Sequence, residues 1–405
     1  MSEYHTPVML DESVSALITN PSGTYADATF GGGGHTAGIL SRLTDDGRVI
    51  AFDRDMDAVA NRVEDPRLTL IHNNFRFIHN YALLLQTGKT AGHGHDGIIT
   101  AGAAEVPGEA FFSEPGLSPD GSRVEESGRG SKMARAGAAE ASDSPFSAMS
   151  ELLPDGGKVD RQEFLPDGGK ADAQEGRMDG RIFDGILADL GVSSHQFDTA
   201  GRGFSFRYEQ APLDMRMNTE GGMTAADIVN GYAQEELEKV LRLYGEVENA
   251  GKVARLIVSA RDTGIIETTG DLDRAIAPAV PRFAEHKYLA KVYQALRIEV
   301  NQEMRSLEKF LQGATASLKA GGRLVVITYH SLEDRMVKNF IKTGNVDGEI
   351  RRDIYGPVPS PLKAVNRKPI LPGESEISTN TRARSAKLRI AELTAGEVVK
   401  KEERV

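Results

Sequence analysis

The amino-acid sequence predicts an α/β fold: a doubly wound, mostly parallel sheet with an inserted all-helical domain. Short apolar runs alternate with segments of helical spacing, and a glycine-rich turn follows the first of these runs. A block between Thr224 and Lys291 has helical spacing almost throughout. Alternation of strands and helices is typical of parallel sheets, because consecutive parallel strands need a crossover connection, which is usually a helix.

The first unit of the sheet runs from Thr24 to Asp53. Thr24–Phe30 is predicted to be a strand, Gly31-Gly32-Gly33-Gly34-His35 a turn into a helix, and Arg48–Asp53 a second strand that ends in an acid. Glycines let the backbone approach a ligand closely, and an acid about 20 residues further on can accept hydrogen bonds from a ribose. The unit therefore predicts a site for a ribose-bearing cofactor.

The glycine spacing alone leaves the cofactor open. Gly32, Gly34 and Ala37 satisfy the pattern G-x-G-x-x-A, which allows a nicotinamide dinucleotide. Enzymes that use S-adenosylmethionine have a similar turn without a cradle for a diphosphate. A plain flexible turn would also explain four glycines, although Asp53 at the expected distance favours a cofactor.

Further elements flank this unit. His5 precedes it and is either a substrate contact or a solvated side chain. Phe75 follows the third predicted strand, where an adenine could stack, although a core phenylalanine at a helix start is an equal reading. The periodicity predicts helices over Asp11–Ile18, Met56–Val63 and Arg76–Leu85 and a strand over Leu68–His72.

Composition narrows the class of protein. The 405 residues contain no cysteine, which excludes disulfides and thiolate metal sites, and no metal site is predicted. The N-terminus does not resemble a secretory signal, and no stretch is apolar enough to span a membrane, so we expect a cytoplasmic protein. Residues 89–180 contain 17 acids and 9 basic residues, a balance of -8 out of the net -11, which leaves -3 for the remainder. That remainder is compatible with a polyanionic partner, because residues 363–390 contain 7 basic residues and 2 acids.

Residues 88–180 differ in character from the rest of the chain. They are rich in Gly, Ala, Ser, Glu and Asp, and Leu-Pro-Asp-Gly-Gly-Lys occurs at 153–158 and again at 165–170. Such a segment buries too little apolar surface to offset its ordering entropy, so we expect a disordered insertion. Asp96–Ile99 resembles the strand that comes later, and we interpret it as part of this insertion.

The sheet is predicted to resume with the apolar run from Ile182, and Asp189 ends that strand. In doubly wound sheets ligands bind beyond the carboxyl ends of the strands, which places Asp189 at the site. The following loop contains Phe204, Phe206, Asp214 and Arg216. Aromatic faces beside arginines suit an unpaired base, and an apolar lid over the cofactor would explain the same residues.

The last part of the chain contains helices and two further strands. Ser331 is a candidate N-cap with Asp334 at the third helical position, and His330 follows a strand. The end of Asn380–Ile390 resembles a last edge strand. Helices are predicted over Ala225–Asn230, Gln234–Tyr244, Asn249–Thr263, Thr269–Ala279 and Tyr288–Leu318, and a strand over Arg323–Tyr329.

The chain is thus predicted to comprise a divided core and two insertions. The predicted segments are residues 1–87 and 181–222 of the core, 88–180 as the low-complexity insertion, 223–287 as the helical substrate domain, 288–395 as the second part of the core, and 396–405 as a tail.

Several separated motifs resemble one family, the bacterial small-subunit ribosomal RNA cytosine-N4 methyltransferases that use S-adenosylmethionine. The motifs are Tyr4–Leu10, Thr29–His35, Asp53-Arg54-Asp55, Asp184–Ser194, Arg202–Phe206, Leu213–Met217, His330–Arg335 and Arg382–Arg389. They occur in the family's order and span nearly the whole chain except residues 88–180. The resemblance implies a class I methyltransferase core, a helical substrate domain and, as the target, N4 of a cytosine in the decoding region of 16S ribosomal RNA.

The resemblance also implies roles for individual residues. Cofactor contacts would come from Gly33, Gly34, His35, Asp53, Phe75, Asp189 and Gln196. Candidates on the substrate side are Phe204, Phe206, Asp214, Arg216, His330, Arg382 and Arg384. The family's usual pattern lacks the insertion, often has a larger polar residue than Gly32, and commonly has proline at Thr381.

The catalytic residue stays open. Many amino-methylases use an Asp-Pro-Pro-Tyr type turn, whereas this chain has Asp189-Leu190-Gly191-Val192, so Phe204 or Phe206 would have to supply the aromatic ring. His330 is either a general base or a neutral side chain that positions RNA. The rival functions are a nicotinamide-dependent oxidoreductase, for which no second dinucleotide feature is found, and an S-adenosylmethionine-binding RNA-binding or assembly factor without catalysis.

The expected partner is small-subunit ribosomal RNA. The chain outside the insertion is almost neutral, so it lacks the broad basic surface that would grip free RNA by its phosphates alone. We therefore expect recognition of an assembled or nearly assembled subunit. The basic side chains expected to contribute are Arg202, Arg207, Arg216, Arg382, Arg384, Lys387 and Arg389.

Overall fold

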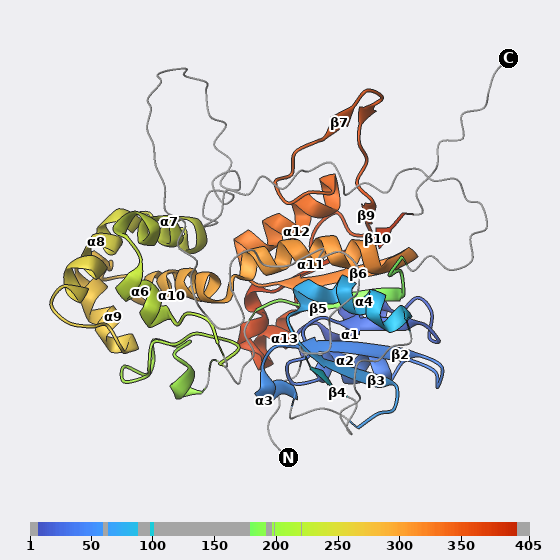
Figure 1. Ribbon diagram of the computed structural model, residues 1–405, viewed down its shortest axis with the longest axis horizontal. Coiled ribbons are helices and arrows are strands. Elements are labelled where there is room, and N and C mark those ends of the chain that lie inside the picture. Colours follow the sequence, from blue (N-terminus) through green and yellow to red (C-terminus); the bar gives the residue numbers. More distant parts are fainter. Residues whose placement is uncertain are drawn as a thin grey trace, which may run out of the picture.

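An eight-stranded, mostly parallel sheet with helices on both faces forms the body of the molecule, and the predicted α/β class is confirmed (Figure 1). The computed structural model describes residues 7–59, 64–87, 98–100, 179–191, 197, 199–219 and 221–394. The strand order is β4-β3-β2-β1-β5-β6-β10-β9. The strands are β1 (Thr24–Asp27), β2 (Arg48–Asp53), β3 (Leu68–His72), β4 (Ile98–Thr100), β5 (Phe183–Asp189), β6 (Leu318–Thr328), β9 (Leu362–Ala364) and β10 (Lys387–Leu393).

Strand direction divides the sheet. Strands β4 to β6 are mutually parallel, whereas β10 runs antiparallel to β6 and β9 runs antiparallel to β10. The chain order reverses at β1, which pairs with β2 on one side and β5 on the other. Such a switch point leaves a crevice at the carboxyl ends of the strands, where doubly wound proteins bind ligands.

The two faces of the sheet carry separate apolar cores, because side chains alternate along each strand. Ile186 and Leu324 face the larger core, whereas their neighbours Leu187 and Val325 face the other. The larger core contains residues of η1 (Phe75–Phe77), α4 (Ile78–Gln86), α11 (Glu303–Ser317) and α12 (Ser331–Thr343). The second contains residues of α1 (Leu10–Leu17), α2 (Gly34–Leu40), η6 (Thr381–Ser385) and β10, and a small third cluster contains Val59 of α3 (Met56–Val59).

A group of helices lies to one side of the sheet, and α10 connects it to the body (Figure 1). Thr224 begins α6 and Thr268 begins α9 with reciprocal capping boxes to Asp227 and Asp271, which fixes both starts. The group comprises α6 (Ala225–Gly231), α7 (Gln234–Gly245), α8 (Ala250–Arg261), α9 (Thr269–Ile276) and η5 (Ala277–Ala279), followed by α10 (Glu285–Asn301). Two short elements, η4 (Ala200–Arg202) and α13 (Glu374–Thr379), lie elsewhere in the chain.

Two sequence predictions, one about the long helix before β6 and one about the last strand of the sheet, are wrong. The helix predicted over Tyr288–Leu318 is two helices, α10 and α11, because Gln302 adopts a left-handed conformation with φ 47°. The strand at 387–393 is not the edge of the sheet, since β9 pairs with its outer side. A short segment around β9 contains no strong alternation, so the sequence pattern alone could not show that pairing.

The boundary of the predicted insertion also needs correction. Ile98–Thr100 forms β4 and pairs in parallel with Leu70–His72 of β3, so the segment interpreted as part of the insertion is an edge strand of the sheet. The position of β3 explains this, because without β4 it would be an open edge of the sheet, which a short apolar run can join. Residues 88–97 and 101–178 of the predicted insertion lie outside the described residues.

Candidate active site

The glycine turn between β1 and α2 is shaped by two backbone requirements. Gly33 has φ 75°, and a Cβ there would lie 3.0 Å from the ring of Phe30. A Cβ on Gly34 would lie 2.9 Å from Pro7. By contrast Gly31, with φ 52°, borders open space, where the nearest atom to a Cβ would be the carbonyl oxygen of Thr29 at 3.9 Å. The turn thus presents bare backbone next to the end of β2.

Asp53 ends β2 directly beside this turn. Its Oδ2 accepts a hydrogen bond from the N–H of Gly31 at 2.7 Å, and its Oδ1 accepts one from the N–H of Asp55 at 2.9 Å. Burial raises the pKa of Asp53 to about 6, against the opposing effect of the two N–H donors. The carboxylate therefore fixes the glycine turn while one part of its surface stays exposed.

Asp27 at the end of β1 supports the same turn from beneath and was not singled out from the sequence. It is fully buried, its Oδ2 accepts the hydroxyl of Thr36 at 2.7 Å, and its Oδ1 accepts the N–H of Thr29 at 3.1 Å. An acid at the end of an otherwise apolar buried strand is the signal that could have identified it. Its role is to hold the first turn of α2 against β1.

Asp189 ends β5, the strand next to β1. Its Oδ1 accepts the hydroxyl hydrogen of Tyr329 at 2.7 Å, and its Oδ2 lies 3.7 Å from Nδ1 of His35. Its own N–H donates to Oγ1 of Thr29 at 2.7 Å. Burial raises the pKa of Asp189 to about 6, whereas His35 and the Tyr329 hydroxyl lower it.

His35 connects this acid to the N-terminal segment. The ring is 5 % exposed, and its Nε2 donates to the carbonyl oxygen of Val8 at 3.0 Å. Tyr329 was not identifiable from the sequence, because no local pattern shows that a tyrosine after β6 reaches the end of β5. Gly33, Gly34, His35, Asp53 and Asp189 are therefore brought together at one edge of the sheet.

Two other predicted cofactor contacts behave differently. Phe75 is partly buried, and its ring packs edge-on against Phe310 with centroids 5.2 Å apart. This contact agrees with the core interpretation and leaves one part of the ring available. Gln196 and His5 lie outside the described residues.

The aromatic residues of the substrate-side loop pack inward. Phe204 is 4 % exposed and belongs to the larger core. Phe206 packs against Tyr293 and His286 of α10, with ring centroids 5.5 and 5.8 Å apart. Neither ring stands free in the manner expected of a base-stacking platform.

Asp214 and Arg216 form a two-pronged ion pair in the same loop. Nε of Arg216 donates to Oδ1 of Asp214 at 2.9 Å, and Nη2 donates to Oδ2 at 2.7 Å. This guanidinium lowers the pKa of Asp214 despite partial burial. The pair stiffens the turn around Met215, which has a strained φ of 61°.

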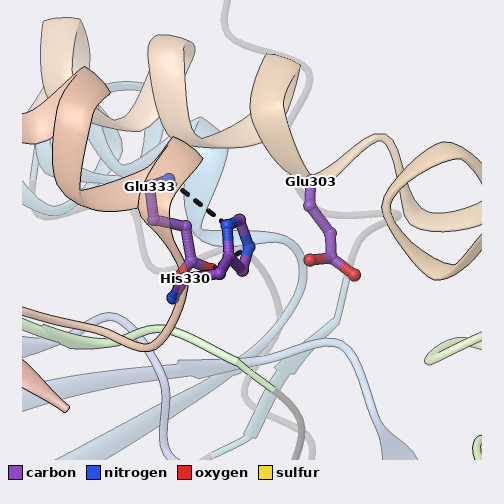
Figure 2. A group of neighbouring side chains, drawn as sticks. All are labelled: Glu303, His330 and Glu333. Atoms are coloured by element: carbon purple, nitrogen blue, oxygen red, sulfur yellow. Dashed lines mark hydrogen bonds and ion pairs between the residues drawn. The ribbon is translucent and has the colours of Figure 1, made fainter. Parts of the chain in front are cut away.

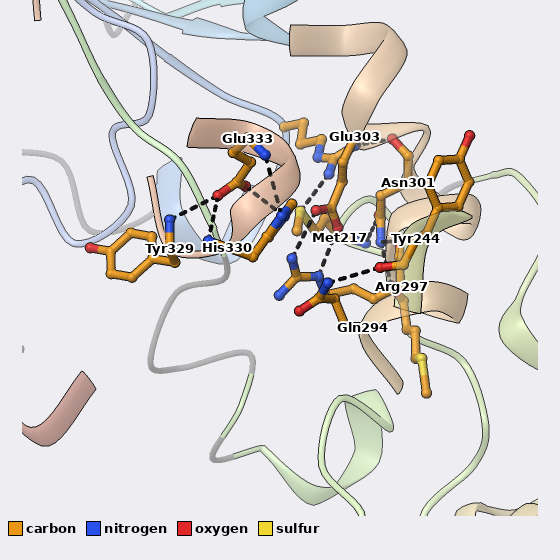
Figure 3. Close-up of polar contacts among 11 residues, drawn as sticks. Met217, Tyr244, Gln294, Arg297, Asn301, Glu303, Tyr329, His330 and Glu333 are labelled. Carbon is orange, nitrogen blue, oxygen red and sulfur yellow. Dashed lines mark hydrogen bonds and ion pairs between the residues drawn. The ribbon is translucent and has the colours of Figure 1, made fainter. Parts of the chain in front are cut away.

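Asn301 fastens this loop to the junction between α10 and α11 (Figure 3). Its side chain accepts the N–H of Met217 at 2.8 Å and donates to the carbonyl oxygen of Met215 at 2.8 Å. Arg54 donates to the carbonyl oxygen of Asn301 at 3.3 Å. The side-chain amide of Asn301 thus joins the loop to the helix break, and its backbone carbonyl joins the helix break to the segment after β2.

His330, and not Ser331, caps α12. The N–H of Glu333 donates to Nδ1 of His330 at 3.4 Å, while the Glu333 carboxylate accepts the N–H groups of Tyr329 and His330 at 2.8 and 3.3 Å. The predicted Ser331 cap is wrong, because Ser331 instead bonds Glu246 of the helical group at 3.1 Å. The N-cap of α12 thus lies one residue earlier than the preference of serine for this position predicts.

Glu303, His330 and Glu333 come together with ligand atoms within 4.8 Å of one another (Figure 2). Both Glu303 oxygens, however, accept hydrogen bonds from Arg297 at 2.9 Å. Nε2 of His330 lies 3.1 Å from Glu333 Oε1 but lacks hydrogen-bond geometry to any partner within the described residues. A guanidinium on one of the three acceptors disfavours a cation, so this group is better described as a buried charge network.

Two of the side chains predicted to bind RNA form ion pairs within the protein instead. Arg389 is 9 % exposed and forks onto Asp334 at 2.7 and 3.1 Å. Arg202 is 11 % exposed and contacts Asp55 at 3.1 Å. These two pairings correct the expectation that both residues face RNA. Arg382 lies over the ring of Phe197 at 5.8 Å, and Arg384 is exposed.

Comparisons with known proteins identify the same family of methylases over nearly the whole chain. Residues 2–100 and 164–394 match the model of the MraW methylase family. The chain is 44% identical to the ribosomal RNA small subunit methyltransferase H of Bacteroides fragilis (strain YCH46), over 96% of this chain and 97% of that protein. Proteins of the same name from Flavobacterium johnsoniae and Christiangramia forsetii are 39% and 38% identical, each over 96% of this chain and 98% of the relative. No helix in the described ranges is long and apolar enough to cross a membrane.

Proposed function

Because this chain belongs to the MraW methylase family, we propose that it transfers a methyl group from S-adenosylmethionine to N4 of a cytosine in the decoding region of 16S ribosomal RNA. The observation that carries the proposal is the meeting of the glycine turn with two partly buried acids, Asp53 and Asp189, at the switch point of the sheet. The names of the relatives support ribosomal RNA as the substrate class.

The residues at the turn fit such a cofactor. Gly31 leaves open space where a side chain would stand, and Asp53 keeps lone pairs for two ribose hydroxyls after bonding Gly31 and Asp55. Phe75 follows β3 on the same edge of the sheet, where it can contact the adenine. Gln196 is proposed beside the methionine end from the family resemblance alone.

Transfer to an exocyclic amine also needs an acceptor for a proton. S-adenosylmethionine, when bound, would supply an electrophilic methyl group. As the bond from N4 of cytosine to that methyl forms, the bond from the methyl to the sulfonium sulfur breaks, the thioether leaves and N4 loses one proton. We assign the acceptor role to Asp189, because its pKa of about 6 leaves it mostly ionised at neutral pH and Tyr329 holds it in one orientation. His330 is the alternative acceptor from the sequence, but its Nδ1 accepts the N–H of Glu333, which places the proton of the neutral ring on the buried Nε2 and leaves neither nitrogen free to accept another.

Incorporation of label from methyl-labelled S-adenosylmethionine into unmethylated small subunits tests the reaction. Digestion of the product to nucleosides should place the label on N4-methylcytidine. A nicotinamide enzyme is tested in parallel by thermal shift with each cofactor added separately. Stabilisation by the dinucleotide alone, or cofactor binding without any transfer, would contradict the proposal.

The substrate is proposed to be an assembled or nearly assembled small subunit. A base must leave its stack to reach the site, which costs least for a nucleotide already held out of a helix. Two of the predicted RNA contacts, Arg202 and Arg389, are paired within the fold, which leaves still fewer cations to grip free RNA. Initial rates on subunits and on protein-free rRNA at matched salt decide this, and equal rates would contradict it.

A further inference from the structure

A hairpin after α12 projects from the body of the molecule (Figure 1). It is formed by β7 (Arg352–Asp353) and β8 (Gly356–Pro357), which pair antiparallel, and we call residues 350–358 the basic arm. Ile354 and Tyr355 form its two-residue tip and are 90% and 85% exposed. The tip therefore presents two large apolar side chains to solvent.

The neck of the arm is fixed by a buried amide. Asn345 is 8% exposed and accepts the N–H groups of Gly348 and Glu349 at 2.8 and 3.1 Å. The same side chain donates to the carbonyl oxygen of Glu349 at 2.7 Å. Val358 donates its N–H to the carbonyl oxygen of Arg351 at 2.9 Å, which closes the two strands. The exposed tip is thus carried on a defined support.

The tip residues are not those that a turn requires. Two-residue hairpin loops favour Asn-Gly or Asp-Gly, because these residues adopt positive φ and are polar. Within the described residues no large apolar side chain outside the arm is as exposed as Ile354 except Phe283. An isoleucine and a tyrosine at this position gain nothing from the fold, which indicates that they contact another molecule.

The charge of the arm indicates the kind of molecule. Arg351 and Arg352 are exposed beside the tip, and no ion pair joins either of them to another residue in the described part of the chain. Lys363, on β9, is also exposed where the chain returns to the sheet. The one acid of the arm, Asp353, lies between these arginines and the tip, and its Oδ1 accepts the N–H of Tyr355 at 2.7 Å, so this carboxylate holds the turn. An aromatic ring on the same short hairpin as two guanidiniums matches an unpaired base beside two phosphates, whereas an apolar protein partner would leave the arginines unexplained.

We propose that the basic arm binds a single-stranded segment of small-subunit ribosomal RNA, with a base stacked on Tyr355 and neighbouring phosphates held by Arg351 and Arg352. This assignment rests on the proposed function, because it takes ribosomal RNA as the substrate. The arm would extend recognition beyond the nucleotide that enters the active site. It also supplies RNA-facing cations in place of the buried Arg202 and Arg389.

Binding to isolated small subunits, measured without turnover, tests the arm. Tyr355→Ala should weaken the Kd by about tenfold, as loss of one stacked base would. Tyr355→Phe is the matched control, since it keeps the ring, and it should bind like the wild type. Because no methyl transfer is needed, subunit binding without transfer would contradict the proposed reaction and still leave the arm test readable.

The charge contacts have their own readout. The double variant Arg351→Gln and Arg352→Gln should reduce the slope of log Kd against log salt by about 1.4, the value for two phosphate contacts to a single strand. Affinity for S-adenosylmethionine should stay unchanged in all variants. An unchanged Kd with Tyr355→Ala together with an unchanged salt slope would overturn the proposal.

A photoreactive residue at position 355 identifies the partner directly. Cross-linking to ribosomal RNA is the expected result. Cross-linking only to a ribosomal protein, or no cross-link in a complex that forms with wild-type affinity, would overturn the assignment of RNA as the occupant.

Discussion

The acids that end β2 and β5 are alike in pKa but are held in opposite ways. Asp53 accepts two backbone N–H groups, one from Gly31 and one from Asp55, both within 22 residues along the chain. Asp189 is held by the Tyr329 hydroxyl, 140 residues away, and faces the His35 ring. Burial raises the pKa of both carboxyls to about 6.

This difference suits different tasks. Asp53 is held by backbone N–H groups, which are present whatever side chains the donor residues carry, and this suits a permanent binding contact. Asp189 is held by the side chain of Tyr329 and faces that of His35, so its pKa depends on the identity of these two residues. We therefore assign ground-state binding of the cofactor to Asp53 and the chemical step to Asp189.

The largest effect is expected at Asp189. Asp189→Asn keeps the shape but cannot accept a proton, so kcat should fall by about 100-fold or more. The Kd for S-adenosylmethionine should change by less than about threefold, because the amide can still accept the Tyr329 hydroxyl. Single-turnover methyl transfer and calorimetry measure the two quantities. An unchanged kcat would exclude Asp189 as the proton acceptor.

Asp53 should show the reverse pattern. Asp53→Ala removes a charged acceptor for two ribose hydroxyls, each worth about 1.5 to 3 kcal/mol, so the Kd should weaken well over tenfold. Asp46→Ala, in the exposed turn before β2, is the matched control and should leave the Kd unchanged. Calorimetry on the folded variants checks this, and equal affinities in both would exclude Asp53 from the cofactor site.

Tyr329→Phe sharpens the comparison, because only Asp189 depends on this hydroxyl. Loss of one hydrogen bond of about 1 kcal/mol should lower kcat about fivefold near pH 6. The hydroxyl lowers the pKa of Asp189, so the acidic limb of the pH–rate profile should move to higher pH. A profile identical to that of the wild type would show that Asp189 ionisation does not control the rate.

The two acids should behave alike in the pH dependence of folding. A folded-state pKa of about 6, above the ordinary 3.8, makes each carboxyl contribute stability below pH 3.8 that is lost as pH rises through 6. Asp53→Asn and Asp189→Asn abolish this loss. Their Tm relative to the wild type should therefore rise between pH 4 and 7.5, at about 2 to 4 °C per kcal/mol. Thermal melts of ligand-free protein would contradict this if the difference stayed constant with pH.

The same contrast explains what the sequence could predict. The turn at Gly33 and Gly34 and the acid Asp53 belong to one local βαβ motif, whose backbone geometry requires particular residue types at fixed spacing and can therefore be predicted from the sequence. The pairing of Tyr329 with Asp189 has no such signal, because it depends on two strands becoming neighbours in the sheet. Asp27 was readable in principle as an acid ending a buried strand.

The wrong predictions of secondary structure also arise from contacts that the local sequence does not show. The helix predicted through Gln302 is interrupted where the side-chain amide of Asn301 hydrogen-bonds the backbone of Met215 and Met217, which lie 86 and 84 residues earlier in the chain. Ser331 was predicted as a cap by residue type, whereas His330 reaches the same N–H through its ring nitrogen. Ile98–Thr100 is a strand because β3 offers an edge, although its surroundings are polar in composition.

The smallest effect is expected from shortening the chain between β4 and β5. The family match leaves out residues 101–163, and the contacts that hold Asp53 and Asp189 come from other parts of the chain. Replacing 101–163 with a short Gly-Ser linker should therefore leave the Tm and the S-adenosylmethionine affinity nearly unchanged, since loop closure depends only weakly on length.

A second, longer deletion, of residues 88–163, makes this test specific. It removes β4 as well, so β3 loses its parallel partner along Leu70–His72 and becomes the edge of the sheet. Asp53 lies on β2, which pairs with β3 at His72, so this loss should lower the Tm and weaken cofactor binding more than it affects Asp189 on β5. Thermal melts and calorimetry on both deletions decide the matter. A shorter deletion that melts as low as the longer one would show that residues 101–163 pack against the fold, and equal loss at both acids would show that the two halves of the sheet are not independent.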